Sequence, residues 1–139
     1  MVDWMFEVIR AFSMSSQTFY LSVQYLDRFL EQTEKEVAQN DIHLLGIAAM
    51  FVASKFEDVI PLFMKTMIIR VSHGRLTERQ ILSAERELCT TLKWKLSSCP
   101  TSLEYLNVYL SHSYFSKLSE ISEIREISGF LTLICLHHI

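Results

Sequence analysis

Residues 42–55 (IHLLGIAAMFVASK) would be apolar on nearly every face if they formed a helix. A helix that is hydrophobic all round belongs either in a membrane or in the interior of a protein. This segment is shorter than the roughly 20 apolar residues that a membrane-spanning helix needs. Its small residues, Gly46, Ala48, Ala49 and Ala53, let neighbouring helices approach its backbone closely. The segment therefore predicts a central helix surrounded by other helices.

The chain is also poor in turn-forming residues. Only three Gly and two Pro occur among its 139 residues, whereas average usage gives about 16 of the two together. Folds made of many short strands and hairpins need these residues, so long helices joined by few loops are expected instead. We therefore predict an all-α fold, and the length suffices for one buried core.

Hydrophobic spacing predicts five helices in the first part of the chain, at residues 1–12, 17–32, 41–57, 62–70 and 78–93. Asn40 or Asp41 is the expected N-cap of the third helix. Thr77 and Gln80 have the spacing of a capping box at the start of the fifth. Four outer helices around one apolar helix give a compact five-helix bundle over residues 1–97.

The helical pattern restarts after Pro100, where Thr101 is an expected N-cap. A second helix is expected over residues 120–138. Residues 98–139 thus predict the first two helices of a second unit, which about 40 residues are too few to complete. The first of these two helices is expected to be amphipathic, and the last is apolar over residues 130–136.

Charge and cysteine content argue against several classes of protein. The formal net charge is −3, which argues against a nucleic-acid-binding protein. The chain begins without the pattern of a signal peptide, and its longest apolar runs, residues 44–53 and 130–136, are too short to cross a bilayer. No membrane association is therefore expected. Cys89, Cys99 and Cys135 show no disulfide or zinc spacing and are expected to be reduced thiols. His137 and His138 adjoin Cys135, but three consecutive helical residues cannot all face one ion, so no metal and no cofactor are expected.

Three charges fall on apolar helical stripes. Asp27 shares a stripe with Tyr20, Val23 and Leu30 and is expected to face inward. Lys55 ends the central helix. Glu85 shares a stripe with Ile81 and Leu88. A lone buried charge costs several kcal/mol, so these groups need partners. They are either residues at the edge of the core whose charged heads reach water, or charged anchors within a binding face. No nucleophile, glycine-rich phosphate loop or metal cluster accompanies them, so no enzymatic activity is expected.

Four segments resemble the cyclin box: residues 2–8 (VDWMFEV), 18–30 (TFYLSVQYLDRFL), 44–58 (LLGIAAMFVASKFED) and 76–88 (LTERQILSAEREL). The resemblance covers about residues 1–100 and is closest to mitotic A/B-type cyclins. The remaining residues resemble the opening of the second cyclin repeat. The resemblance implies a cyclin fold that is truncated within its first helix and within its second repeat.

The resemblance implies a regulatory subunit that binds and activates a cyclin-dependent protein kinase in cell-cycle control. Such a heterodimer would act in the nucleus and cytoplasm. In the family, the residues that match Lys55 and Glu85 contact the kinase near its C-helix and activation segment. Phe56 and Trp94 match positions at which the family packs aromatic side chains on the kinase.

The resemblance further implies a partial substrate-docking patch that accepts Arg-x-Leu motifs of substrates or inhibitors. Its matching residues are Met1, Trp4, Glu7, Ile42 and His43, with Trp4 as the floor and Glu7 as the group that attracts the basic residue. The alternative is that Trp4 is an ordinary core residue of the first helix. The arginine that usually pairs with the aspartate matching Asp27 is absent, so Asp27 is expected to find Arg28, Lys55 or water, or to have a raised pKa.

Two other functions remain open at this point. One is a cyclin-fold module like those of transcription factor IIB, which bind DNA. The other is a partial, non-functional cyclin product whose second-repeat helices expose an apolar patch and associate.

Overall fold

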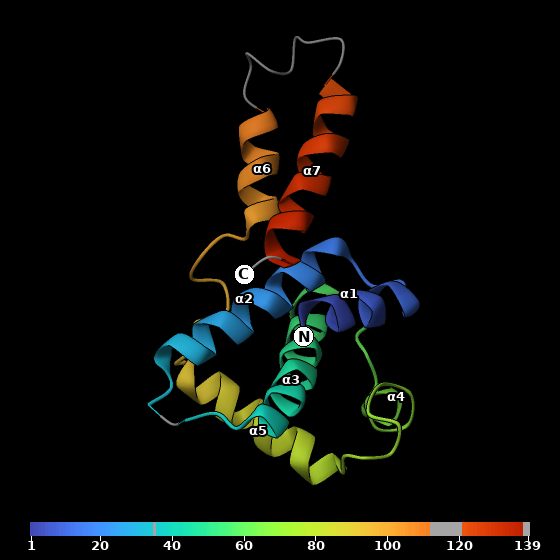
Figure 1. Ribbon diagram of the computed structural model, residues 1–139, viewed down its shortest axis with the longest axis vertical. Helices are drawn as coiled ribbons and strands as arrows, with labels where there is room; N and C mark the ends of the chain where they lie inside the picture. The colour runs from blue at the N-terminus through green and yellow to red at the C-terminus, as the bar shows by residue number, and fades with distance from the viewer. Residues whose placement is uncertain (35, 112–120, 138–139) are drawn as a thin grey trace. The chain divides into compact units, whose positions relative to one another are not determined.

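The protein is described here by a computed structural model that covers residues 1–34, 36–111 and 121–137. All regular structure in these ranges is helical (Figure 1), as the sequence predicted. The elements are α1 (Val2–Ala11), α2 (Ser16–Gln32), α3 (Gln39–Glu57), α4 (Met64–Thr66), the π-helix η1 (Met67–Val71), α5 (Glu78–Thr91), α6 (Ser102–Ser111) and α7 (Ile121–His137). The chain divides into two compact units, Met1–Ser98 and Cys99–Ile139.

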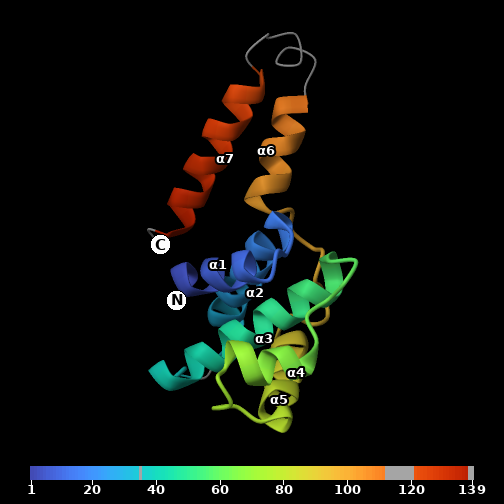
Figure 2. The ribbon, with the colours of Figure 1, turned by 90° about the vertical axis from the view of Figure 1, so that its right-hand side faces the viewer.

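Helix α3 is the centre of the first unit. It contacts α1, α2, η1 and α5 (Figures 1 and 2). Residues 45–54 are buried without a break, which no amphipathic surface helix would allow. The central helix predicted from residues 42–55 is therefore confirmed.

The predicted capping box at Thr77 is present, and the predicted N-cap Thr101 also forms one. The Gln80 backbone N–H donates to Thr77 Oγ1 at 3.3 Å, and the Thr77 N–H donates to Gln80 Oε1 at 2.9 Å. At the start of α6, the Glu104 N–H donates to Thr101 Oγ1 at 3.2 Å and the Thr101 N–H donates to Glu104 Oε2 at 2.6 Å. These reciprocal bonds satisfy backbone donors that the first turn of a helix leaves unpaired.

The start of α3 differs from the prediction. Its N-cap is Ala38, which makes no side-chain hydrogen bond, and Asn40 and Asp41 lie inside the first turn. An aspartate stabilises the first turn of a helix through the helix dipole as well as through capping. Its presence alone therefore does not distinguish the cap from the residues that follow it.

The fourth predicted helix, residues 62–70, is shorter and irregular. Helix α4 covers one turn and continues into η1, where the Ser72 N–H donates to the Met67 carbonyl five residues earlier, at 2.9 Å. Met67 and Val71 are buried, whereas Ile69 and Arg70 are exposed. This wider turn could not be predicted, because the hydrophobic spacing of residues 62–70 is also compatible with an α-helix.

In the second unit α6 and α7 contact each other. The predicted last helix is present with nearly the expected bounds, and the connection over residues 112–120 lies outside the described residues. Phe130 and Leu131 of α7 are exposed. Within the described ranges, no helix is both long enough and apolar enough to cross a membrane.

Candidate functional site

Lys55 and Glu85, two of the predicted site residues, form an ion pair between the last turn of α3 and the middle of α5. The Nζ atom of Lys55 also lies 4.1 Å from the centroid of the Phe51 ring, one helical turn earlier. An ammonium group at this distance is attracted by the electron-rich face of the ring. The carboxylate and the ring together hold the ammonium group in one orientation.

The surrounding packing explains why both charges stay at the edge of the core. Lys55 directly follows the buried run of α3 and is exposed, and a cation in the last turn is favoured by the helix dipole. Glu85 is half-buried and lies between Ile81 and Leu88, both of which are buried. The charged heads therefore reach solvent while their helices pack together, which suits an edge-of-core pair and a binding face equally well.

Phe56 and Trp94, the two predicted aromatic contacts, are exposed by 49% and 69%. Phe56 follows Lys55 at the end of α3. Trp94 lies just after α5, where Lys93 and Trp94 have backbone φ angles of 53° and 58°. Left-handed backbone at a non-glycine residue costs roughly 1–2 kcal/mol. Two such residues in succession end α5 abruptly and leave a large aromatic side chain in solvent.

Arg28 of α2 stabilises this turn and was not predicted to do so. Its Nη2 donates to the Lys95 carbonyl at 2.9 Å. A hydrogen bond from a charged donor is stronger than a neutral one. Arg28 thus ties α2 to the segment that carries Trp94, a contact between residues 67 positions apart that no local pattern reveals.

Cys89 lies one turn beyond Glu85 and is buried. Burial, followed by the Glu85 carboxylate, raises the pKa of the Cys89 thiol, and the Lys55 ammonium opposes this shift. The thiol is therefore protonated at neutral pH and is a poor nucleophile. Its role here is packing.

The predicted docking patch joins α1 to α3. The Trp4 and His43 rings lie 4.3 Å apart between centroids, at an interplanar angle of 42°. Gly46 makes room for this contact, because a Cβ atom there would lie 3.1 Å from Met1 Sδ and 3.7 Å from Trp4 Cζ3. Trp4 and Ile42 are half-buried, whereas Met1, Glu7 and His43 are exposed. Trp4 consequently lines the junction of the two helices and still presents part of its ring.

His43 is the titratable group of this patch. Burial, and then the positive charge of Arg75, lower the pKa of its imidazole. Both effects disfavour the protonated form. The imidazole ring that contacts Trp4 is therefore mostly neutral at pH 7.

The prediction that Asp27 faces inward is wrong, because its side chain is exposed. The buried stripe of α2 continues through Leu26 and Phe29, and Leu30 is exposed like Asp27. Arg28, one of its expected partners, donates to the Lys95 carbonyl instead. Partial burial of the carboxyl group nevertheless raises the pKa of Asp27.

Asp58 is a site residue that sequence reasoning missed. It is the C-cap of α3, three positions after Lys55. Its Oδ1 accepts hydrogen bonds from the Ser15 N–H at 3.1 Å and from the Thr18 hydroxyl at 2.9 Å. It therefore fixes the start of α2 to the end of α3 beside the Lys55–Phe56 surface. An acidic residue directly after a helix was the available signal, but its partners lie about 40 positions away.

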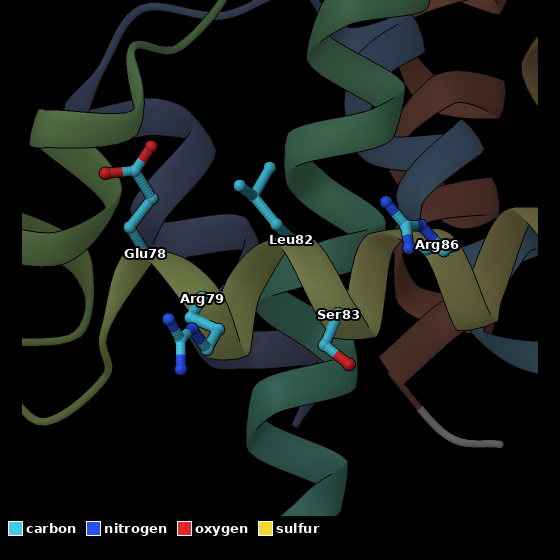
Figure 3. Close-up of a pocket in the computed structure, with 5 residues that line it drawn as sticks. All are labelled: Glu78, Arg79, Leu82, Ser83 and Arg86. Carbon is cyan, nitrogen blue, oxygen red and sulfur yellow. The ribbon is translucent and has the colours of Figure 1, made fainter.

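A further hollow of about 550 Å³ lies on α5 (Figure 3). Glu78 and Leu82 project on one side of the helix and Arg79 and Ser83 on the other (Figure 3), so this is an open, mixed surface along a helix. Among the described residues no group of three His, Cys, Asp or Glu side chains could hold a metal ion. His138, one of the residues considered for such a site, lies outside the described ranges.

Known proteins similar to this chain include cyclins of two types. It is 33% identical over 121 residues to the G1/S-specific cyclin-E1 of Danio rerio, which covers 87% of this chain and 29% of that protein. It is 34% identical over 123 residues to cyclin-A2 of Xenopus laevis, and the match covers 88% of this chain and 29% of that protein. It is also 34% identical over 134 residues to the G2/mitotic-specific cyclin-A of Hydra viridissima, and the match covers 96% of this chain and 31% of that protein. The chain thus spans less than a third of the length of these relatives.

The fold is similar to that in the X-ray structure of a viral cyclin from herpesvirus saimiri. The TM-score is 0.73 at 21% identity, and the match covers 90% of this chain and 52% of that chain. Residues 1–97 match the family described as "Cyclin, N-terminal domain". The matched residues include the Lys55–Glu85 pair and the Trp4–His43 contact. Because this match spans most of the sequence, the chain belongs to the cyclin family.

Proposed function

We propose that this chain is a regulatory subunit that binds a cyclin-dependent protein kinase and activates it in cell-cycle control, without catalysis of its own. The observation that carries the proposal is the Lys55–Glu85 ion pair, flanked along the chain by the exposed Phe56 and Trp94. Aromatic side chains around a fixed charge are typical of the residues that dominate protein interfaces. Membership of the cyclin family supports the same partner.

The ion pair suits this role because it is already formed in the free chain. Long charged side chains lose rotamer entropy when an interface orders them. The Glu85 carboxylate and the Phe51 ring restrict the Lys55 ammonium before any partner arrives. The proposed surface therefore presents its charges at a reduced ordering cost.

Activation then follows from differential binding. A rigid surface that binds the active position of the kinase C-helix better than the inactive one shifts the kinase toward the active state. The kinase's own lysine–glutamate pair and activation loop are then set for phosphoryl transfer. The shift is limited to the difference in binding free energy between the two kinase states.

We also propose that this chain recruits substrates of the kinase. The patch of Met1, Trp4, Glu7, Ile42 and His43 would accept Arg-x-Leu motifs, with the leucine on the exposed part of the Trp4 ring. The exposed Glu7 carboxylate would attract the arginine. A heterodimer of this kind would act in the nucleus and cytoplasm. Relatives of the E and A types both occur, so the mitotic A/B-like assignment remains part of the proposal.

The test is a binding titration of the purified chain against a cyclin-dependent kinase, followed by a histone phosphorylation assay. Replacing both anchors, Lys55→Ala with Glu85→Ala, is expected to cost about 2–5 kcal/mol if they are desolvated at the interface. That loss corresponds to a Kd increase of roughly 30-fold to several thousand-fold.

A matched control is Glu31→Ala with Lys65→Ala, which removes the same two charge types from exposed positions elsewhere. Circular dichroism establishes that both double variants are folded. Equal kinase affinity of the anchor variant and the control would overturn the assigned face. Absence of binding by the unaltered chain would overturn the proposed function.

A further inference from the structure

The segment formed by α4 and η1 has one buried side and one open side. Met67 and Val71 are buried, and η1 packs on α3. On the other side Phe63 and Ile69 are exposed by 67% and 56%. Figure 2 shows α4 at the front of the first unit, with no other helix of that unit in front of it. Two large apolar side chains therefore face solvent on a short, anchored segment.

These side chains border a shallow groove of about 470 Å³, lined by Phe63, Lys65, Thr66, Ile69 and Arg70. The lining residues comprise two apolar side chains, two cations and no carboxylate. The whole chain, by contrast, carries a net charge of −3. An apolar floor with two positive groups on an acidic protein favours a ligand that is both apolar and anionic.

The groove is held in a defined shape. The Arg70 guanidinium carbon lies 4.9 Å from the centroid of the Phe12 ring, at the end of α1, and this contact fixes one of the two cations. The π-helical turn is closed by the Ser72 N–H and by the Ser72 hydroxyl, which donates to the Ile68 carbonyl at 2.8 Å. Single π-helical turns occur frequently at functional sites. A preformed surface of this kind loses little entropy when it binds.

We propose that this groove docks an extended acidic–hydrophobic peptide segment of a partner protein. An aliphatic or aromatic side chain of the peptide lies between Phe63 and Ile69. Neighbouring Asp or Glu side chains pair with Lys65 and Arg70. The exposed Val59 and Ile60 lie in the segment that leads to Phe63 and are not part of the groove lining. None of these residues belongs to the proposed kinase-binding set.

The size and charge of the groove favour a peptide over a membrane surface. Stable membrane attachment by a basic patch takes several cations, typically a cluster of 4–8. The groove offers two, close to apolar side chains that can distinguish one peptide from another. A peptide satisfies both features at once.

The experiment uses the unaltered chain and two fluorescein-labelled peptides, GDLFDELG and its charge-reversed counterpart GKLFKKLG, in a fluorescence polarisation titration. The acidic peptide is expected to bind at least tenfold tighter than the charge-reversed one, because the groove carries two cations and no carboxylate. Raising the ionic strength should weaken its binding, because salt screens exposed charges.

Phe63→Ser with Ile69→Ser should weaken binding of the acidic peptide at least tenfold. Lys65→Glu should weaken the acidic peptide and improve the charge-reversed one. Leu82→Ser is the control, since it removes an exposed apolar side chain from α5 and should change nothing. Circular dichroism of each variant separates loss of the groove from loss of the fold.

Several results would overturn the proposal. One is equal binding of the two peptides, or no binding of either by the unaltered chain. Another is binding to phosphatidylserine vesicles that is stronger than binding to the acidic peptide and that Lys65→Glu abolishes, because the ligand would then be a membrane surface. A third is self-association in velocity sedimentation that Phe63→Ser removes, because the occupant would then be a second copy of this chain.

Discussion

The Thr18 hydroxyl donates a hydrogen bond of 2.9 Å to Asp58 Oδ1, joining the first turn of α2 to the residue that ends α3. The same oxygen accepts from the Ser15 N–H. Ser15 is itself the N-cap of α2, and its Oγ accepts from the Thr18 N–H at 3.1 Å. The end of the central helix therefore shares one polar cluster with the start of its neighbour, beside the Lys55–Phe56 surface.

Replacing Asp58 should destabilise the first unit. Asp58→Ala leaves the Thr18 hydroxyl and the Ser15 N–H without their acceptor, and losing such a partner costs about 1–3 kcal/mol. Asp58→Asn keeps one acceptor oxygen and should cost less. Urea unfolding followed by circular dichroism measures both values. Glu31→Ala, at an exposed position near the end of α2, is the control, and a loss as large as that of Asp58→Ala would contradict the capping role.

The Lys55–Glu85 pair should matter little for folding. Both groups reach solvent, and ion pairs at such positions contribute about 0–1 kcal/mol. A double-mutant cycle with Lys55→Ala and Glu85→Ala should therefore give a coupling free energy below about 1 kcal/mol in urea unfolding. A coupling of several kcal/mol would mean that the pair is primarily structural and would weaken its assignment as a binding anchor.

Gly46 provides a test of the contact between α1 and α3. In a helix interior, alanine is favoured over glycine by about 1 kcal/mol. The added Cβ approaches the flexible end of the Met1 side chain, which is exposed and can move. Gly46→Ala should therefore raise the unfolding free energy by up to about 1 kcal/mol.

Gly46→Leu should have the opposite effect. Its larger side chain must displace the Trp4 ring, and overpacking of this kind typically costs 1–3 kcal/mol. The two variants differ only in how far the side chain reaches, so unfolding in urea compares them directly. Equal stabilities would show that Trp4 does not pack closely against α3.

Hydrophobic spacing predicted the helices well because most of them bury one defined stripe. Residues 42–55 were recognisable as central because nearly every face was apolar. The capping box at Thr77 and the N-cap at Thr101 were recognisable because they depend only on neighbouring residues. The same spacing failed at Asp27. A stripe through Tyr20, Val23 and Leu30 is compatible with helical geometry. Tyr20 and Val23 are buried, but the later positions on that stripe, Asp27 and Leu30, are exposed.

The residues of the candidate site could be selected from the sequence, whereas the contacts that they make could not. Lys55 and Glu85 stood out as charges on apolar stripes, yet their pairing depends on how α3 packs against α5. Asp58 and Arg28 were missed because their partners lie 40 and 67 positions away in the chain. The π-helical turn at η1 depends on a shift of backbone hydrogen bonds by one residue, which leaves no trace in the order of side chains.

His43 makes the stability of the first unit depend on pH. Its pKa in the folded chain lies below the ordinary value of 6.5, owing to burial and to Arg75. Between the folded pKa and 6.5 the unfolded chain binds more protons than the folded one, so the unfolding free energy rises with pH in this window. The contribution of His43 is fully present above pH 6.5 and is lost as the pH falls through the folded pKa. His43→Gln should flatten this slope. Arg75→Gln should move the imidazole titration in proton NMR upward, toward the value measured in urea. A native His43 titration at or above that value would contradict the neutral ring inferred beside Trp4.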